Sequence, residues 1–190
     1  YSKAWEHHLN PILDALEALE GVTSIVRRYG VRKVDGESGI KLLSGPHPPD
    51  TLIIKEHGLK FIVRPSKGQK TGLFLDQREH RFFLGQRSQN LRVANLFAYT
   101  GGFSVYAAAG GAELVSTIDI SAPAIHDAKE NFKINGINPD KHHFETTDAF
   151  KWKGEHQLDL LICDPPSLSH KKKSDKQAMQ AYKDLANLCA

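Results

Sequence analysis

The chain has 190 residues, of which 40% are hydrophobic and 25% are charged. This composition is typical of packed globular proteins and excludes disordered and fibrous classes, while the length suits one ordinary domain with a small appendage. The formal net charge of +3 is too small to indicate a polyanionic partner by itself. No apolar run reaches the roughly 20 residues of a membrane-spanning helix, so we expect a cytoplasmic protein without a membrane partner.

The first part of the chain, residues 1–65, predicts a small α+β unit. Apolar side chains at helical spacing over residues 3–20 predict an amphipathic helix. Glycines and prolines interrupt residues 21–49, which predicts short strands and loops there. Residues 51–64 are two β-rich runs around His57-Gly58, and such a pair suits the two-residue turn of a β-hairpin.

The remaining part, residues 66–190, predicts a separate α/β domain. After a glycine-rich loop, Asp76 and Glu79 have the spacing of a capping box, which predicts a helix beginning at Gln77. Strands then alternate with helices: strands at 91–98, 113–121, 142–149 and 158–164, and helices at 102–111, 122–136 and 175–190. The strands are apolar almost throughout, which predicts a Rossmann-like parallel sheet that binds its ligand beyond the carboxyl ends of the strands.

The first turn of this domain contains Gly101 and Gly102, between a strand and a helix. Glycines permit a tight turn and lack the Cβ that would keep a ligand away from the N–H groups of the helix start, although they can also serve the turn alone. Asp119 ends the next strand, close to the spacing at which a carboxylate meets ribose hydroxyls. It can also cap the following helix, for which Ser121 is the better cap.

Three further features surround this turn. Positions 97–102 read Phe-Ala-Tyr-Thr-Gly-Gly rather than G-x-G-x-x-G, which argues against NAD and favours another adenosine cofactor. Asp148 follows the third strand, where it either accepts from an adenine amino group or is a solvated loop residue. Asp164 ends the fourth strand and is followed by Pro165-Pro166, whose locked φ angles suit the positioning of a substrate or a simple chain reversal.

Cysteines and lysines complete the candidate residues. Cys163 lies in an apolar strand and Cys189 on the last helix, so we expect both in the core and neither a disulfide framework nor a metal site. Four lysines within residues 169–176 follow the Pro-Pro turn at the expected mouth of the site. They form either a solvated loop or contacts to RNA phosphates, and their position favours RNA.

Four blocks of the sequence together resemble the class I S-adenosylmethionine-dependent methyltransferases, and more narrowly the bacterial large-subunit ribosomal RNA methyltransferases of the RlmI and RlmK types. The blocks are KTGLFLDQREHR, NLFAYTGGFSVYAAAGGA, DISAPAIHDAKENFKING, and DPPSLSH with AMQAYKDL. The resemblance covers roughly residues 50–190 and implies S-adenosylmethionine as cofactor and a ribosomal RNA base as methyl acceptor.

The resemblance also implies roles for particular residues. The methionine part of the cofactor would lie against Phe97, Ala98, Tyr99, Thr100, Gly101 and Gly102, the ribose against Asp119, and the adenine against Asp148. Ile120, Ser121, Ala149 and Asp164 would be further cofactor-binding residues, and Asp164, Pro165 and Pro166 would be catalytic. Lys70, Thr71, Gly72, Asp76 and Arg78 would close the site.

The sequence departs from that family in three respects. Family members often carry an N-terminal RNA-binding PUA domain, which is not readable before the helix expected from residue 3. The family fold has seven strands and only the first four are readable before Ala190, so we expect a chain truncated at its C-terminus. Methylation of cytosine C5 requires a cysteine thiolate, whereas the residue after Pro-Pro is Ser167. The acceptor is then either a nitrogen such as guanine N7, or cytosine C5 with a cysteine from the missing part.

Two rival functions stay open from the sequence. One is a methyltransferase of a small molecule or protein, which would show no salt-dependent RNA binding. The other is a non-catalytic module with a cofactor-binding fold. The oligomeric state is also open, with a homodimer as one option.

Overall fold

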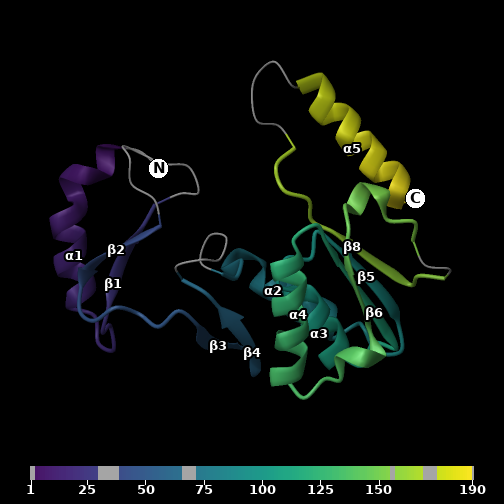
Figure 1. The fold of residues 1–190 in the computed structure, drawn as a ribbon, viewed down its shortest axis with the longest axis horizontal. Helices are drawn as coiled ribbons and strands as arrows, with labels where there is room; N and C mark the ends of the chain where they lie inside the picture. Colours follow the sequence, from purple (N-terminus) through teal and green to yellow (C-terminus); the bar gives the residue numbers. More distant parts are fainter. Residues whose placement is uncertain (1–2, 30–38, 66–71, 155–156, 169–174, 190) are drawn as a thin grey trace. The chain divides into compact units, whose positions relative to one another are not determined.

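The computed structural model describes residues 3–29, 39–65, 72–154, 157–168 and 175–189 (Figure 1). The chain divides into two units, Tyr1–Leu52 with Val63–Gly72, and Ile53–Ile62 with Leu73–Ala190. The division assigns most of the expected hairpin to the second unit, whereas the boundary at residue 65 stays a prediction from the sequence. No helix in the described part of the chain is long and apolar enough to cross a membrane.

The first unit consists of one helical segment and one small sheet. A 3-10 helix, η1 (Lys3–His8), leads into helix α1 (Leu9–Glu17). Strands β1 (Ile25–Arg28) and β2 (Ile40–Ser44) pair in antiparallel orientation. The Arg27 guanidinium pairs with the Glu6 carboxylate and lies 4.8 Å from the centre of the Tyr29 ring, so one cation joins η1 to the sheet.

A β-hairpin follows the first sheet in the chain, and most of it belongs to the second unit. It consists of β3 (Leu52–Glu56) and β4 (Leu59–Val63). Its turn residues His57 and Gly58 have φ of 47° and 84°, the left-handed backbone that a two-residue turn of the I′ type needs. The His57 ring stacks on Phe82 of the following helix, with ring centres 4.4 Å apart, so the turn itself packs against the second unit, to which it belongs.

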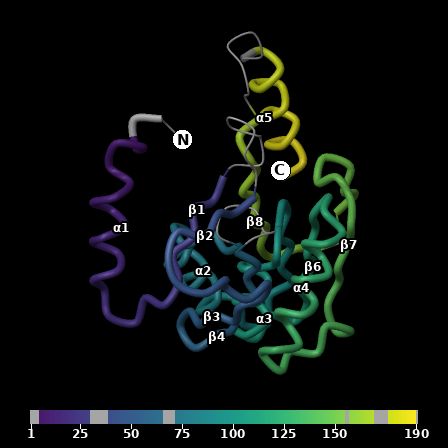
Figure 2. The backbone as a smooth tube through the Cα atoms, turned by 60° about the vertical axis from the view of Figure 1, so that its left-hand side comes forward, coloured from purple at the N-terminus to yellow at the C-terminus, as the bar shows by residue number. Residues whose placement is uncertain are grey.

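The second unit is an α/β layer structure, as predicted. In chain order it contains η2 (Leu75–Gln77), α2 (Arg78–Gly85), β5 (Arg92–Leu96), α3 (Gly102–Ala109), β6 (Leu114–Asp119), α4 (Ala122–Ile134), η3 (Pro139–Lys141), β7 (His143–Thr146), η4 (Ala149–Lys151), β8 (Leu160–Cys163) and α5 (Asp175–Cys189). The strands form one parallel sheet in the order β7-β6-β5-β8. Figure 2 shows the same sheet turned by 60°.

Both faces of the sheet are covered, which explains why its central strands are almost continuously apolar. The successive crossovers from β5 through α3 to β6 and through α4 to β7 run in one direction, so both helices lie on one face. On the other face, Ala94, Leu96 and Ile118 pack with Ala149 and Trp152. Residues of β5 after Arg92 are all buried, as expected for the centre of a parallel sheet.

Two asparagines, Asn131 on α4 and Asn135 at its C-cap, bind the hairpin backbone as a neighbouring strand would. The Asn135 side chain accepts a hydrogen bond from Lys60 N and donates one to Lys60 O, both at 2.8 Å. Asn131, which is fully buried, accepts from Ile62 N at 2.8 Å. These side chains satisfy backbone groups of β4 that would otherwise be exposed on an edge strand.

The predicted start of α2 is wrong. The chain first makes the 3-10 turn η2, and α2 begins at Arg78 with Gln77 at its N-cap position, where no side chain caps the described helix end. A carboxylate oxygen of Glu79, the expected capping partner, instead lies 3.5 Å from Nε2 of His57 and 3.5 Å from Nε of Arg78. The cap predicted at Ser121 is confirmed, because its hydroxyl accepts from Ala124 N at 3.4 Å.

Candidate functional site

Four predicted site segments lie at one edge of the sheet. Residues 97–102 follow β5, Asp119 ends β6, Asp148 follows β7 and Asp164 follows β8. Because the four strands are parallel neighbours, their carboxyl ends meet at the same edge, where ligands of open α/β sheets bind. The sequence therefore brings these segments together as expected.

The loop after β5 contains unusual backbone conformations. Phe97 and Tyr99 have φ of 55° and 50°, and Gly101 has φ of 74°. Left-handed backbone at a bulky aromatic residue costs about 1–3 kcal/mol and persists only where the surroundings enforce it. Here Ala98 N donates to Ile118 O at 2.9 Å, which ties the loop to β6. Backbone strain of this kind clusters at ligand sites.

The Asp119 carboxylate is held in one orientation by the backbone on both sides of it. One oxygen accepts from Tyr99 N and the other from Ser121 N, each at 2.8 Å. A carboxylate offers about four lone-pair positions, so each oxygen keeps one for a further donor. Two acceptors side by side are what a vicinal diol needs, and the neighbouring apolar residue Ile120 is 74% exposed.

The two glycines of the turn make room for protein atoms. A Cβ on Gly101 would lie 2.9 Å from the Cβ of Ala128, and one on Gly102 would lie 3.1 Å from Cδ of Arg81. The carbonyl of Thr100, which is buried, accepts from the Asn131 amide at 2.9 Å. The turn is therefore packed tightly from α4 on one side and from α2 on the other.

Polar residues beneath the turn were not predicted from the sequence. The Asn95 amide donates to Ser104 Oγ at 3.0 Å, and both side chains are buried. This bond joins the end of β5 to the first turn of α3. An asparagine inside an otherwise apolar strand was the visible signal, since a buried polar side chain needs a partner.

Asp148 and its neighbour occupy different environments. An oxygen of Asp148 accepts from Phe150 N at 3.1 Å and so caps η4, which leaves the carboxylate half-buried at the edge of the sheet. Ala149 is 3% exposed and packs into the core. Phe150 meets Phe97 edge to face, with ring centres 5.9 Å apart, so η4 supports the strained loop.

Asp164 lies exposed after β8 and faces the start of α2. The Gln77 amide nitrogen lies 3.4 Å from an oxygen of Asp164, and the Gln77 amide oxygen lies 2.7 Å from Nδ1 of His80. This contact was not predicted, because the two residues are 87 positions apart in the chain. Pro165 is half-buried and Pro166 is exposed.

The segment expected to close the site is described only in part. Lys70 and Thr71 lie outside the described residues, and Gly72, with φ of 94°, belongs to the first unit. Asp76 is exposed. Arg78 donates from Nε to Nε2 of His57 at 3.2 Å, so it contacts the hairpin turn.

The two cysteines differ from each other. Cys163 packs beside the core cluster, and burial, followed by the neighbouring Cys189 and Asp164, raises the pKa of its thiol to about 12. A thiol with that pKa is almost entirely protonated at neutral pH and is a poor nucleophile. Cys189 is exposed, so its predicted core position is wrong, although its thiol lies beside Cys163 at the end of α5.

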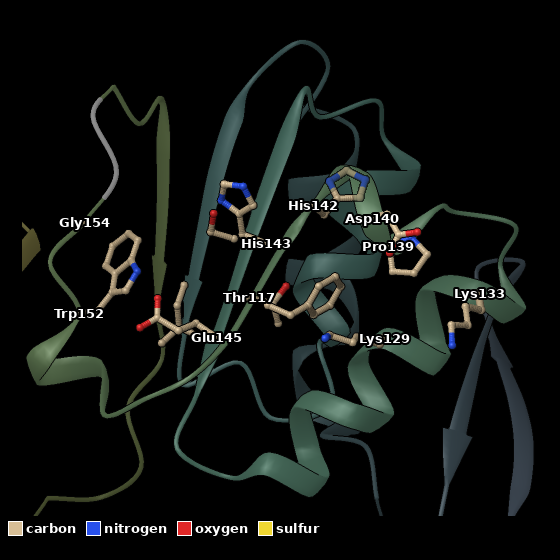
Figure 3. Close-up of a pocket in the computed structure, with 13 residues that line it drawn as sticks. Thr117, Lys129, Lys133, Pro139, Asp140, His142, His143, Glu145, Trp152 and Gly154 are labelled. Carbon is tan, nitrogen blue, oxygen red and sulfur yellow. The ribbon is translucent and has the colours of Figure 1, made fainter.

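A cavity of about 550 Å³ lies elsewhere, at β7 on the edge of the sheet (Figure 3). It is lined by Ser116, Thr117, Ile118, Lys129, Lys133, Pro139, Asp140, His142, His143, Phe144, Glu145, Trp152 and Gly154. Among the described residues, no predicted site residue lines it. Several of its polar groups already have structural partners, which argues against a role in the chemistry.

These partners are specific. Lys133 pairs with Glu130 at 2.7 Å, and Lys129 Nζ lies 5.5 Å from the centre of the Phe144 ring. His142 accepts from Val115 N through Nδ1 at 3.1 Å. Burial, followed by the nearby His143 and Lys141, lowers the pKa of His142, so its ring is kept neutral as an acceptor.

Comparison with known proteins identifies the family. A family described as S-adenosylmethionine-dependent methyltransferase matches residues 15–187. Ribosomal RNA large subunit methyltransferase I of Tolumonas auensis is 38% identical, over 100% of this chain and 50% of that protein. Ribosomal RNA large subunit methyltransferase of Deinococcus radiodurans is also 38% identical, over 98% of this chain and 48% of that protein.

A solved structure agrees with both. The crystal structure of SMU.776, a methyltransferase complexed with SAH, has a TM-score of 0.78 and 25% identity over 97% of this chain and 50% of that one. The chain therefore belongs to the S-adenosylmethionine-dependent methyltransferases, as its sequence predicts, and the cofactor of that family is S-adenosylmethionine. It spans about half the length of the curated relatives it matches.

The packing at Gly101 can be tested by Gly101→Ala. Left-handed backbone costs an alanine about 1–2 kcal/mol, and the contact with Ala128 adds about 1–3 kcal/mol of overpacking. Gly136→Ala is the matched control, because Gly136 has φ of 71° but no atom within 4 Å of its Cβ position. Urea unfolding should show the larger loss for Gly101→Ala, and equal losses would contradict the close contact.

The His142 contact predicts a pH dependence of stability. The unfolded chain takes up a proton on this residue below about pH 6.5, whereas the folded chain takes it up only at a lower pH. The neutral His142 therefore costs no stability above about pH 6.5, where it is neutral in both states. Below that pH the unfolded chain gains the proton first, so the free energy of unfolding falls as pH falls. His142→Asn, which keeps an acceptor for Val115 N, should reduce the loss of unfolding free energy between about pH 7.5 and about pH 5.5.

The control for this experiment is His126→Asn, since His126 is exposed on α4. It should leave the pH dependence of the wild-type protein in place. If His142→Asn and wild type lose the same free energy over that pH range, His142 is not held neutral by its surroundings.

Proposed function

We propose that the chain carries the cofactor-binding part of a methyltransferase that transfers a methyl group from S-adenosylmethionine to a base of large-subunit ribosomal RNA. The observation that carries the proposal is the Asp119 carboxylate, which two backbone N–H groups orient beside a strained loop. The names of the curated relatives support the RNA substrate.

The residues at the carboxyl edge fit the cofactor by their chemistry. Asp119 would accept both ribose hydroxyls through its two remaining lone pairs, and the exposed side chain of Ile120 would offer apolar surface to the adenine. Phe97 to Gly102 would line the methionine part, and Asp148 would accept from the adenine amino group. Bound S-adenosylmethionine would supply a methyl group on a positively charged sulfur.

Asp164 would act on the acceptor rather than on the methyl group. Its carboxylate is exposed at the end of β8, followed by Pro165-Pro166, whose φ angles are locked. The Gln77 amide faces the carboxylate and orients it. A carboxylate in this place can accept from the amino group of a base and hold its ring against the methyl group, so that proximity lowers the barrier.

The acceptor atom stays open between a nitrogen and cytosine C5. Attack on cytosine C6 requires a thiolate, and Cys163 is protonated at neutral pH. Guanine N7 carries its own lone pair and needs only positioning. Cytosine C5 stays a candidate acceptor if a thiolate comes from residues outside those the structure describes.

Asp119→Asn should weaken binding of S-adenosylmethionine by about 10- to 100-fold, since a hydrogen bond to a charged group contributes about 1.5–3 kcal/mol. Asp159→Asn is the matched control, because Asp159 also accepts a backbone N–H, from Arg92 at the opposite end of β5. Calorimetric titration measures both. Unchanged affinity in a folded Asp119→Asn protein would remove Asp119 from the cofactor site.

The RNA substrate is tested by transfer of labelled methyl groups to deproteinised large-subunit ribosomal RNA, with small-subunit ribosomal RNA as control. If the chain is part of a longer protein, the complete protein is used. We expect labelling of the large-subunit RNA alone, with an affinity that falls with salt. Cofactor binding without RNA labelling would favour a small-molecule or protein substrate, and no cofactor binding would favour a non-catalytic module.

The same assay tests Lys171, Lys172 and Lys173, which lie outside the described residues. Replacing all three with alanine should weaken RNA binding and reduce the steepness of its salt dependence, because each phosphate contact releases counterions. An unaltered salt slope would make this segment a solvated loop.

A further inference from the structure

We propose that Arg81 is a positioning residue of this site: its buried ion pair with Glu56 holds residues 74–77 between the cofactor loop (residues 97–102) and Asp164. The inference rests on the proposed function and deepens it. Arg81 contacts neither of the predicted ligands, and its effect is transmitted through Phe74 and Gln77.

The ion pair is bidentate and almost fully removed from water. Nε of Arg81 donates to one oxygen of Glu56 at 2.9 Å and Nη2 donates to the other at 2.7 Å. The side chains of Arg81 and Glu56 are 2% and 5% exposed. Burying two charges is costly, and apolar residues often replace such a pair without loss of stability. A role in placing other groups explains the pair better than stability alone.

Glu56 joins the pair to a third element. The hydroxyl of Tyr106, on α3, lies 3.1 Å from both the carboxylate and the backbone carbonyl of Glu56. Burial, followed by the negative charge of Glu56, raises the pKa of Tyr106 above its usual value, so its hydroxyl remains a donor. The ion pair and its contact with Tyr106 therefore link β3, α2 and α3.

Arg81 also contacts the cofactor loop, directly at Gly102 and indirectly through Phe74. Its Nη1 donates to the carbonyl of Phe74 at 2.9 Å, and its Cδ fills the space beside Gly102. The Phe74 ring meets Tyr99 edge to face, with ring centres 5.7 Å apart. Tyr99 N in turn donates to Asp119. The Arg81 guanidinium thus fixes the backbone of Phe74, and the ring of Phe74 contacts the cofactor loop.

The same anchor sets the place of Gln77. Phe74 precedes η2, and Gln77 ends that turn, only three residues beyond the carbonyl that Arg81 holds. The Gln77 amide oxygen is engaged by His80, which turns the amide nitrogen toward Asp164 at 3.4 Å. Moving Phe74 would therefore displace both the loop contact and the donor that faces Asp164.

Arg81→Lys tests the anchor, because lysine keeps the charge but cannot bond both Glu56 oxygens and the Phe74 carbonyl in one plane. We expect affinity for S-adenosylhomocysteine and kcat for RNA methylation each to fall by about 10- to 100-fold, as for a small misplacement of catalytic groups. Arg87→Lys is the matched control, since Arg87 is exposed and lies against Phe83. It should leave both values unchanged.

Two further variants test the Phe74–Tyr99 contact and the Gln77–Asp164 contact separately. They also provide a test if Arg81→Lys fails to fold. Phe74→Leu removes the ring contact with Tyr99 and should weaken cofactor affinity with little change in kcat at saturating cofactor. Gln77→Glu places a second carboxylate against Asp164 and should lower kcat with little change in cofactor affinity. This split assigns one effect to each contact, and a positioning role of Arg81 requires that Arg81→Lys impair both together.

The outcomes distinguish the inference from the proposed function. If wild-type protein does not bind S-adenosylhomocysteine, the proposed function fails and the inference fails with it. If wild type binds and folded Arg81→Lys binds and turns over equally well, or loses only thermal stability, the inference alone is overturned. Wild-type behaviour of both Phe74→Leu and Gln77→Glu would overturn it as well.

Discussion

The Asp119 carboxylate is the interaction on which the candidate site depends. It binds Tyr99 N on one side and Ser121 N on the other, so it joins the strained loop after β5 to the start of α4. The loop can keep left-handed backbone at Phe97 and Tyr99 because this carboxylate, the Ile118 carbonyl and the Asn131 amide hold it. In the proposed function, the two remaining lone pairs of Asp119 would accept the ribose hydroxyls of the cofactor.

Besides the contacts of Asp119, the second unit contains two further groups of polar contacts, both of which include the hairpin. Asn131 of α4 and Asn135 at its C-cap bind the backbone of the hairpin. The hairpin residue Glu56 binds Arg81, which fixes the segment that reaches Asp164. Polar contacts therefore join the hairpin both to α4 and to α2, and the bonds between Glu56 and Arg81 are buried. This arrangement explains why several buried side chains of this unit are polar even though its strands are apolar.

Much of this fold could be predicted from the sequence because it follows from local patterns. Alternation of apolar strands with helices predicts the parallel sheet, and the positions of Asp119 and Asp164 at strand ends predict that they meet at one edge. The features that escaped prediction depend on distant partners. Arg81 looks like a solvated helix residue until β3 brings Glu56 to it. Glu79 fits a capping box in the sequence, but its carboxylate lies beside the guanidinium of Arg78 in the structure. Backbone strain at Phe97 and Tyr99 has no signal in residue type.

The most direct test of the account is a crystal structure of the protein with S-adenosylhomocysteine. We expect the ribose hydroxyls on the two Asp119 oxygens and the amino-acid part along residues 97–102, with the backbone of that loop unchanged. Ligand bound in the cavity at the β7 edge, or bound at the carboxyl edge without contact to Asp119, would contradict it.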